Sequence, residues 1–316
     1  MRWIKKGHIF KPNGELKWSK EYAQVPTPII LKDIYRIFFT TRHYPTENMP
    51  VSSIGYIDVD RKNPSNVLKI NKSAVLTHGV FGSFDEFGQM PADIIKVGEN
   101  KYYMYFTGWS RGISTPYITT IGLAVSKDNC KTFKKIFNGP ILGINKFDPI
   151  LVNGPSVIKV DDTFHMFYSS ATKWIEIDGR KEVFYYVKKA TSKNGIDWIV
   201  NNDFCIETII DDEVQNAPRV SLVNDEYHMW FCYRKGINFR NEIDAGYRLG
   251  LATSKDLINW KRIPENSIGI KKSESGWDSE MMCYPYMICD KSKYLLFYNG
   301  NYFGKVGFGY AELKKD

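Results

Sequence analysis

The sequence predicts an all-β protein, a five-bladed β-propeller built from four-stranded antiparallel blades. The first observation is an aromatic-rich segment that occurs five times along the 316-residue chain. Its third apolar position falls at Ile37, Met104, Met166, Met229 and Leu296, in steps of 67, 62, 63 and 67 residues. So regular a period, in segments of β-branched and aromatic residues, indicates a repeated unit made of strands. The second observation is the aromatic content of 15%, which suits stacked sheets whose wedge-shaped gaps need large side chains.

The inner strand of each blade is predicted from a short apolar segment that precedes the aromatic one. These segments open at Pro28, Pro91, Pro155, Pro218 and Pro285. Proline suits the first residue of a strand, where its missing N–H breaks no ladder hydrogen bond. The aromatic segment then forms the second strand.

The third strand is predicted after the aromatic segment, with a small residue at its centre. These small residues are Gly55, Gly122, Ala190, Gly250 and Gly309. A Ser-x-Asp turn follows at Ser126, with relatives beginning at Ser192 and Ser254, and leads into an outer strand with one large aromatic residue. The turn resembles the Asp-box of sialidase-type propellers, and we expect its role to be structural.

The two ends of the chain predict how the ring closes. The last repeat stops near residue 313 without an outer strand, and residues 2–6 resemble residues 259–263 of the preceding repeat. We therefore expect the first strand of the chain to complete the fifth blade and leave no open sheet edge. On this reading residues 1–316 form a single propeller domain.

Composition limits the class of protein. The five cysteines show no metal-ligand spacing. No cofactor is expected, and a metal at the axis stays open although no ligand spacing argues for one. The chain starts without the apolar run of a signal peptide and has no bilayer-spanning segment, which predicts a cytoplasmic protein without membrane insertion. The net charge of +8 fits an anionic substrate or a lysine-rich surface. No nucleic-acid-binding signature accompanies it, and the oligomeric state stays open.

Two groups of residues are expected on one face of the propeller. A blade that runs down, up, down and up from the axis brings the segments leading into strand one, and those joining strands two and three, to the same side. The first group holds the acids Glu21, Asp85, Glu86, Asp148, Asp211, Asp212, Glu213, Asp278 and Glu280. The second holds Arg42, His43, Trp109, Arg111, Trp174, Tyr233, Arg234, Asn299 and Asn301. Acids, aromatics and guanidinium groups around one axial mouth would suit a carbohydrate.

Two charged residues stand inside predicted inner strands. Arg219 follows its strand proline and Asp93 lies two residues after Pro91, so both are expected near the axis. A buried arginine at this place needs an anion, from the protein or from a substrate.

Several stretches together resemble a known superfamily. They are residues 82–108, with Phe84-Asp85 and Gln89-Met90-Pro91, and residues 227–234, 275–285 (including Tyr284) and 297–301. They resemble the five-bladed glycoside hydrolase superfamily, which includes families 32, 43, 62, 68 and 130, and are closest to a branch labelled only as glycosyl hydrolases or glycosylases. The resemblance covers essentially the whole chain and implies the propeller fold and activity on carbohydrates.

The chain departs from that superfamily at the residues expected to be catalytic. The resemblance implies acids directly beside the strand-one prolines, where this chain has Val25, Asn153 and Asn216. An amide cannot act as a general acid or base. The catalytic candidates are therefore the acids five to seven residues before the prolines, namely Glu213, Asp85, Asp278 and Glu280. Glu213 is the candidate acid, with Asp85 or Asp278 as base or charge stabiliser.

The candidate substrate-binding residues are Arg42, His43, Asp93, Trp109, Trp174, Arg219, Arg234, Tyr284, Asn299 and Asn301. Three functions stay open. The leading one is a glycoside hydrolase that uses paired carboxylates. The second is a phosphorylase or glycosyl transferase acting on a phosphate-bearing or nucleotide sugar, since arginines bind phosphate bidentately. The third is a non-catalytic glycan-binding propeller. The expected partner is accordingly a carbohydrate or sugar phosphate.

Overall fold

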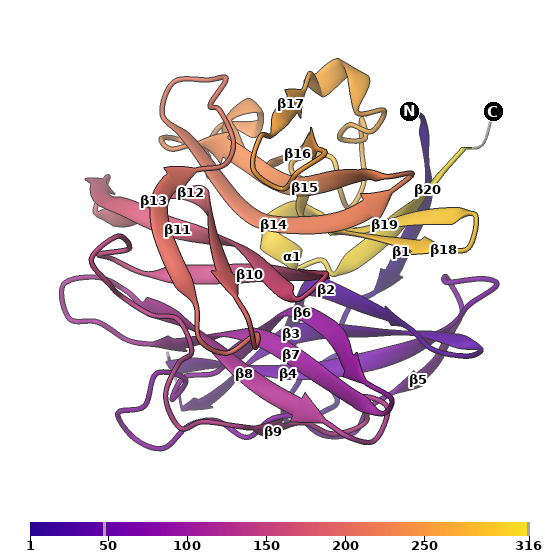
Figure 1. The fold of residues 1–316 in the computed structure, drawn as a ribbon, viewed down its shortest axis with the longest axis horizontal. Helices are drawn as coiled ribbons and strands as arrows, with labels where there is room; N and C mark the ends of the chain where they lie inside the picture. The colour runs from indigo at the N-terminus through magenta and orange to yellow at the C-terminus, as the bar shows by residue number, and fades with distance from the viewer. Residues whose placement is uncertain (47–48, 315–316) are drawn as a thin grey trace.

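The computed structural model describes residues 1–46 and 49–314 and confirms the predicted fold class (Figure 1). Five four-stranded antiparallel sheets follow one another in a ring, forming a five-bladed β-propeller. In the first four blades the strands pair in chain order, so each blade is a simple meander.

The first two blades hold strands β2 to β9. The first consists of β2 (Glu21–Ile30), β3 (Ile34–Thr46), β4 (Met49–Asp60) and β5 (Val67–Ile70). The second consists of β6 (Gln89–Gly98), β7 (Lys101–Ser110), β8 (Ile118–Ser126) and β9 (Lys134–Lys135).

The third and fourth blades hold β10 to β17. The third consists of β10 (Val152–Val160), β11 (Thr163–Ile177), β12 (Arg180–Ser192) and β13 (Ile199–Phe204). The fourth consists of β14 (Glu213–Val223), β15 (Glu226–Lys235), β16 (Arg248–Ser254) and β17 (Lys261–Ile263). Two short 3₁₀ turns, η1 (Ile243–Ala245) and η2 (Glu265–Ser267), lie in its connections.

The fifth blade contains both ends of the described chain. It consists of β18 (Cys283–Asp290), β19 (Lys293–Asn299), β20 (Phe308–Leu313) and, as its outer strand, β1 (Trp3–Phe10), with α1 (Asn301–Gly304) between β19 and β20. Strand β1 pairs with β20 from Trp3 opposite Leu313 to Phe10 opposite Phe308, so the two ends lie side by side (Figure 1). The prediction that the first strand completes the last blade is confirmed.

A cluster of polar side chains joins the first blade to the last. Arg61, just after β4, donates hydrogen bonds to both oxygens of Asp290 at the end of β18, with Nη2 at 2.5 Å and Nε at 2.7 Å. The hydroxyl of Tyr35 donates to the same carboxylate at 2.5 Å. The hydrogen bonds from Arg61 are the main reason why the pKa of Asp290 falls to about 2.

The core lies between neighbouring blades and is built from the repeated aromatic strands. The five residues that define the repeat, Ile37, Met104, Met166, Met229 and Leu296, are all fully buried. The small residues of the third strands have a packing reason. A Cβ added at Gly122 or Gly250 would strike the ring of Phe106 or Phe231 on the adjoining strand.

The inner-strand prolines lie inside their strands rather than at the first residue, which corrects the sequence prediction. Register shifts in four inner strands leave a two-residue bulge, comprising residues 25–26, 154–155, 217–218 and 284–285. A bulge tolerates proline because the ladder is already interrupted there. Pro26, rather than Pro28, is thus the equivalent proline of the first blade.

The residue before each bulge proline has a left-handed backbone, with φ of 57° at Val25, 58° at Gly154, 52° at Ala217 and 52° at Tyr284. All four residues line the space on the propeller axis. In the described ranges, no helix has the length and apolar character needed to cross a membrane.

Candidate functional site

A cavity of about 430 Å³ lies where the inner strands of all five blades converge. Its walls include Val25 of β2, Pro91 of β6, Gly154 of β10, Ala217 of β14 and Tyr284 of β18. The volume lies within the range of small-molecule sites, roughly 300–1,000 Å³. The propeller axis is therefore the place where all blades contribute to one candidate site.

Three arginines give this cavity a positive charge. Arg219 and Arg234 are only 3% and 2% exposed, and Arg42 is half-buried with its guanidinium stacked 4.4 Å from the centre of the Tyr22 ring. Within the described residues, none of the three arginines forms an ion pair with a carboxylate. Arg219 nevertheless interacts electrostatically with the buried carboxylate of Asp93, so the protein itself balances part of this positive charge.

Backbone carbonyl groups fix the two buried arginines. Nη1 of Arg219 donates to the carbonyl oxygens of Gly154 at 3.0 Å and Pro218 at 2.6 Å. Arg234 donates through Nη1 to the carbonyl of Lys235 at 2.8 Å and through Nη2 to that of Val183 at 3.1 Å. Neutral carbonyl groups hold each guanidinium in place without cancelling its charge.

A buried network beside Arg219 ties three inner strands together. The carboxylate of Asp93 accepts hydrogen bonds from the Tyr286 hydroxyl at 2.6 Å, the Val157 amide at 2.7 Å and the Ser156 hydroxyl at 3.1 Å. Burial raises the pKa of Asp93 and lowers that of Arg219, and each charge acts on the other. Asp93 therefore joins three inner strands without lining the cavity, and its oxygens are occupied by protein donors.

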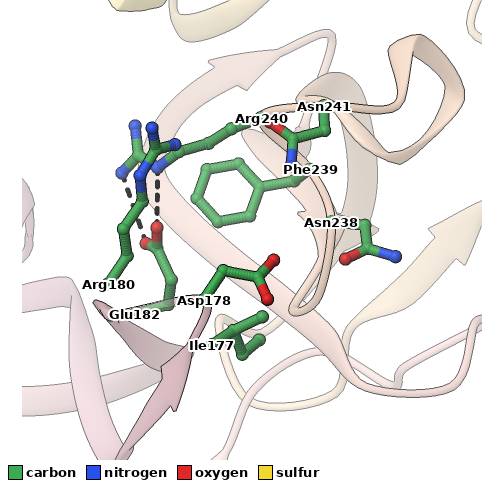
Figure 2. A pocket seen from close by; sticks show the side chains of 8 residues that line it. All are labelled: Ile177, Asp178, Arg180, Glu182, Asn238, Phe239, Arg240 and Asn241. Atoms are coloured by element: carbon green, nitrogen blue, oxygen red, sulfur yellow. Dashed lines mark hydrogen bonds and ion pairs between the residues drawn. The ribbon is translucent and has the colours of Figure 1, made fainter.

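One further ion pair stands at the edge of the cavity. Glu182, near the start of β12, accepts hydrogen bonds from Arg240, in the segment after β15, with Oε1 to Nε at 2.6 Å and Oε2 to Nη2 at 3.2 Å. Figure 2 shows this pair, with the guanidinium of Arg180 beside it. Among the described residues that line the cavity, Glu182 is the single carboxylate.

The predicted catalytic acids Asp85, Glu213 and Asp278 do not line this cavity. Each is buried and paired with a cation on the outer strand of its own blade. The pairs are Asp85 with Lys135 at 2.7 Å, Glu213 with Arg262 at 2.6 Å and Asp278 with Lys5 at 2.6 Å. Asp148 repeats the arrangement with Lys188 of β12, at 3.2 Å.

The expectation that these acids gather at one axial mouth is therefore wrong. In the second to fifth blades, such an acid instead braces the start of the blade against another strand of the same blade, because that strand carries a lysine or arginine opposite it. Glu280, the fourth candidate, is half-buried outside the cavity lining and accepts a hydrogen bond from the Tyr302 hydroxyl at 3.0 Å.

Five of the ten predicted binding residues line the cavity: Arg42, Trp109, Arg219, Arg234 and Tyr284. The others lie elsewhere. Asp93 belongs to the buried network described above. The ring of His43 stacks on that of His78 with centres 6.2 Å apart, and Trp174 packs edge-on against Tyr117 with ring centres 5.2 Å apart.

Asn299 and Asn301 hold turns together instead of facing the cavity. Asn299 donates to the carbonyl of Ala23 at 2.6 Å, and Asn301 accepts from the amide of Glu280 at 2.8 Å. Neither residue lines the cavity, and both amide groups are used by the backbone around them; their binding role stays a prediction.

Sequence reasoning missed Glu182, Arg240 and the tyrosines Tyr117, Tyr185 and Tyr247, which also line the cavity. Glu182 lies on the extended β11–β12 hairpin, whose strands of 15 and 13 residues exceed the 10 and 9 of β7 and β8. The β3–β4 hairpin, with strands of 13 and 12 residues, is nearly as long, so strand length alone does not single out Glu182 in the sequence. The described residues contain no group of three His, Cys, Asp or Glu side chains arranged to hold a metal ion.

The fold is shared with several solved structures, some of them described as glycoside hydrolases. BT0996, solved as a complex with RGII, has a TM-score of 0.72 and 17% identity, and the match covers 99% of this chain and 91% of BT0996. A structure from the GH130 family of mannoside phosphorylases, which contains glycoside hydrolases targeting β-1,2 mannosidic linkages in Candida mannan, has a TM-score of 0.70 and 14% identity, covering 99% and 93%. A glycosyl hydrolase from Bacteroides ovatus has a TM-score of 0.69 and 15% identity, covering 99% and 90%.

The resemblance to five-bladed glycoside hydrolases is thus confirmed for the fold. No protein-family model matches the chain. Two proteins of Mycobacterium tuberculosis, the uncharacterized proteins MT1551 and Rv1502, are each 33% identical to it over 317 aligned residues, covering 99% of this chain and 100% of theirs. The chain belongs to the same family as these two proteins.

Proposed function

We propose that this protein is a carbohydrate-active enzyme that transfers a glycosyl unit to or from phosphate, as a glycoside phosphorylase or a glycosyl transferase does. The observation that carries the proposal is the charge of the axial cavity. Three arginines line it, and none of them forms an ion pair with a carboxylate among the described residues, although Asp93 balances part of the charge of Arg219. Glu182, the one carboxylate among the described lining residues, is paired with Arg240. A phosphate-bearing sugar supplies the missing negative charge.

Hydrolysis by paired carboxylates, the leading expectation from the sequence, has less support. That chemistry needs two carboxyl groups roughly 5 to 9.5 Å apart across the bond to be cleaved. The cavity lining offers Glu182 alone among its described residues. Phosphate removes the need for a second carboxylate, because it serves as the nucleophile itself or as a leaving group stable enough to depart without a protein acid.

The arginines and the remaining lining suit the two halves of such a substrate. A guanidinium group matches the geometry of phosphate oxygens, and a buried one gains most from an anion because it has already lost its water. Trp109 and the tyrosines provide faces for sugar C–H groups, and the amide groups of Asn153 and Asn216 provide partners for hydroxyl groups.

In the proposed reaction, the bond between the anomeric carbon and a phosphate oxygen breaks, and its electron pair stays on the phosphate beside the arginines. An acceptor hydroxyl forms the new bond to the anomeric carbon, and its proton passes to the released phosphate. The reverse sequence is phosphorolysis. One neighbour in fold comes from a family described as mannoside phosphorylases, so this scaffold is compatible with phosphate chemistry.

Calorimetric titration tests the proposal directly. Purified protein is titrated with inorganic phosphate, with hexose 1-phosphates and with the same hexoses lacking phosphate. We expect the phosphorylated compounds to bind and the neutral hexoses to bind far more weakly. Binding of neutral hexoses as tight as that of their phosphates, or hydrolysis of aryl glycosides at a rate independent of phosphate, would refute it.

A non-catalytic function is the second candidate, because both oxygens of Glu182 accept hydrogen bonds from Arg240 and the carboxylate is not free to act. Isotope scrambling between the bridging and terminal oxygens of a labelled hexose 1-phosphate separates the two readings. Scrambling requires that the protein breaks and reforms the glycosyl–phosphate bond, whereas a binding protein leaves the label in place.

A further inference from the structure

A second, smaller pocket of about 150 Å³, whose lining Figure 2 shows, adjoins the axial cavity through shared lining residues. Its lining combines the turn of the β11–β12 hairpin, including Asp178 and Arg180, with Asn238 and Asn241 of the segment after β15. Glu182, Phe239 and Arg240 line both this pocket and the axial cavity. These three residues therefore form the boundary between two neighbouring spaces, which we call the axial cavity and the outer pocket.

The two spaces differ in charge. The axial cavity has three arginines that form no ion pair among the described residues, and only Arg219 has a buried carboxylate, Asp93, acting on it. The outer pocket adds one acid, Asp178, and one base, Arg180, to the shared Glu182–Arg240 pair, so its formal charges cancel. An anion is accordingly favoured in the axial cavity, and a neutral group is favoured in the outer pocket.

The outer pocket contains side-chain oxygen atoms that can accept hydrogen bonds from a ligand. Figure 2 shows the Asp178 carboxylate and the carbonyl oxygen of Asn238 pointing toward one another across the pocket. The nitrogen of the Asn238 amide is occupied, because it donates to Glu242 at 2.9 Å. Two acceptors that face each other repel unless a donor lies between them, and the hydroxyl groups of a sugar are donors of that kind.

We propose that the outer pocket is the binding subsite for a neutral, hydroxyl-rich sugar, while the axial cavity holds the phosphate-bearing sugar. This inference rests on the proposed function and deepens it. The substrate is then an anionic saccharide of at least two units, or a sugar phosphate together with a neutral acceptor. The bond that is made or broken lies beside the Glu182–Arg240 pair, where the two spaces meet.

This arrangement gives the Glu182–Arg240 pair a positioning role. The guanidinium groups of Arg234 and Arg240 both contact the ring of Phe239. Their distances to the ring centre are 3.5 Å for Arg234 and 4.7 Å for Arg240. One aromatic ring therefore links an arginine fixed in the axial cavity to the arginine that holds Glu182. A ligand that spans both spaces would contact this assembly at its middle.

The test compares ligands that fill one space with ligands that fill both. The probes are inorganic phosphate, the 1-phosphates of glucose, galactose, mannose and N-acetylglucosamine, and disaccharide 1-phosphates made by adding one neutral sugar to each. We expect at least one disaccharide phosphate to bind about tenfold more tightly than its monosaccharide phosphate, which corresponds to one or two added hydrogen bonds.

Two variants test whether this gain in affinity arises in the outer pocket. Asn241→Trp fills the outer pocket, and Asp178→Asn removes one of its acceptors while keeping a residue that tolerates the left-handed φ of 51° at this position. Both side chains are exposed, so the folded state is expected to persist. Each variant should abolish the tenfold gain and leave the affinity for inorganic phosphate unchanged.

The outcomes separate the two proposals. Phosphate binding without any gain from the second sugar, or a gain that both variants retain, overturns the outer-pocket subsite and leaves the proposed function standing. If neither phosphate nor any sugar phosphate binds, the proposed function fails as well.

Discussion

Asp148 and Lys188 form an ion pair of 3.2 Å in which neither side chain is more than 2% exposed. Asp148 also accepts hydrogen bonds from the Ser170 hydroxyl at 2.6 Å and the Tyr168 hydroxyl at 3.0 Å. Related pairs occur in the second, fourth and fifth blades. An acid before the inner strand is thus a recurring part of the blade, and its partner lies on a strand of the same sheet.

Lys188→Met should strongly destabilise the fold. The substitution leaves the Asp148 carboxylate buried without a cation, and breaking a buried pair in this way costs about 3–5 kcal/mol. Urea-induced unfolding measures the loss. The double variant Asp148→Asn/Lys188→Met should recover part of it, because no unpaired charge remains, and equal stability of the wild type and the single variant would contradict the assignment.

Glu213→Gln should affect stability rather than chemistry. The amide keeps the shape of the side chain but loses the charge that pairs with Arg262, so the free energy of unfolding should fall by about 1–3 kcal/mol. The affinity for inorganic phosphate should not change, since Glu213 lies outside the axial cavity. Loss of turnover in a variant of undiminished stability would return Glu213 to the catalytic candidates.

Arg42→Met should weaken phosphate binding by about tenfold, because one charge-assisted contact to the anion is lost. Arg42 is half-buried at the cavity and, within the described residues, has no carboxylate partner that the substitution would leave behind. Arg2→Met is the matched control, since Arg2 is exposed at the start of the chain. Calorimetry that finds the same affinity in both variants would exclude Arg42 from the site.

The polar cluster of Arg61, Tyr35 and Asp290, which joins the first and last blades, should stabilise the fold less in acid. The pKa of Asp290 is about 2 in the folded protein, below its ordinary value of 3.8, so the folded state favours the charged carboxylate. Its contribution to stability is complete above about pH 4 and is lost as the pH falls toward 2. Asp290→Asn should lower the unfolding midpoint at neutral pH and remove part of its decline between pH 4 and pH 2. A decline as steep in the variant as in the wild type would show that other groups cause it.

Gly122→Ala should destabilise the second blade by about 1–3 kcal/mol, as overpacked core sites do. The new methyl group would meet the ring of Phe106, whereas a Cβ at Gly139 would meet nothing within 4 Å. Gly139→Ala is therefore the control, and thermal unfolding of both variants checks the difference. Equal midpoints would contradict the packing assigned to the third strands.

The sequence was informative about the blades because the blade signal is local. Ile37 and its four equivalents sit in short segments whose composition alone marks them as buried strands. The position of the prolines was predicted less well, since a bulge at Ala217-Pro218 depends on the register with the neighbouring strand. That register is a property of the sheet.

The candidate site was harder to predict because its charges are decided by distant partners. Asp278 resembles a catalytic acid until Lys5, which precedes it by 273 residues, is placed beside it. Glu182 and Arg240 are 58 residues apart and meet only through an extended hairpin and a long connection. The sequence around Glu182 contains no signal that predicts its contact with Arg240, and the sequence around Arg240 contains none for Glu182.

The pairing of β1 with β20 places a condition on the order of assembly. Among the strands of the described residues, β1 leaves the ribosome first, yet its hydrogen-bonding partner β20 is the last of them to be made. Until β20 is made, the edge of β1 is exposed to unwanted pairing. Circular permutants that join the two ends and open the chain between blades would place β1 next to β20 in the sequence, so that all five blades could fold from continuous segments.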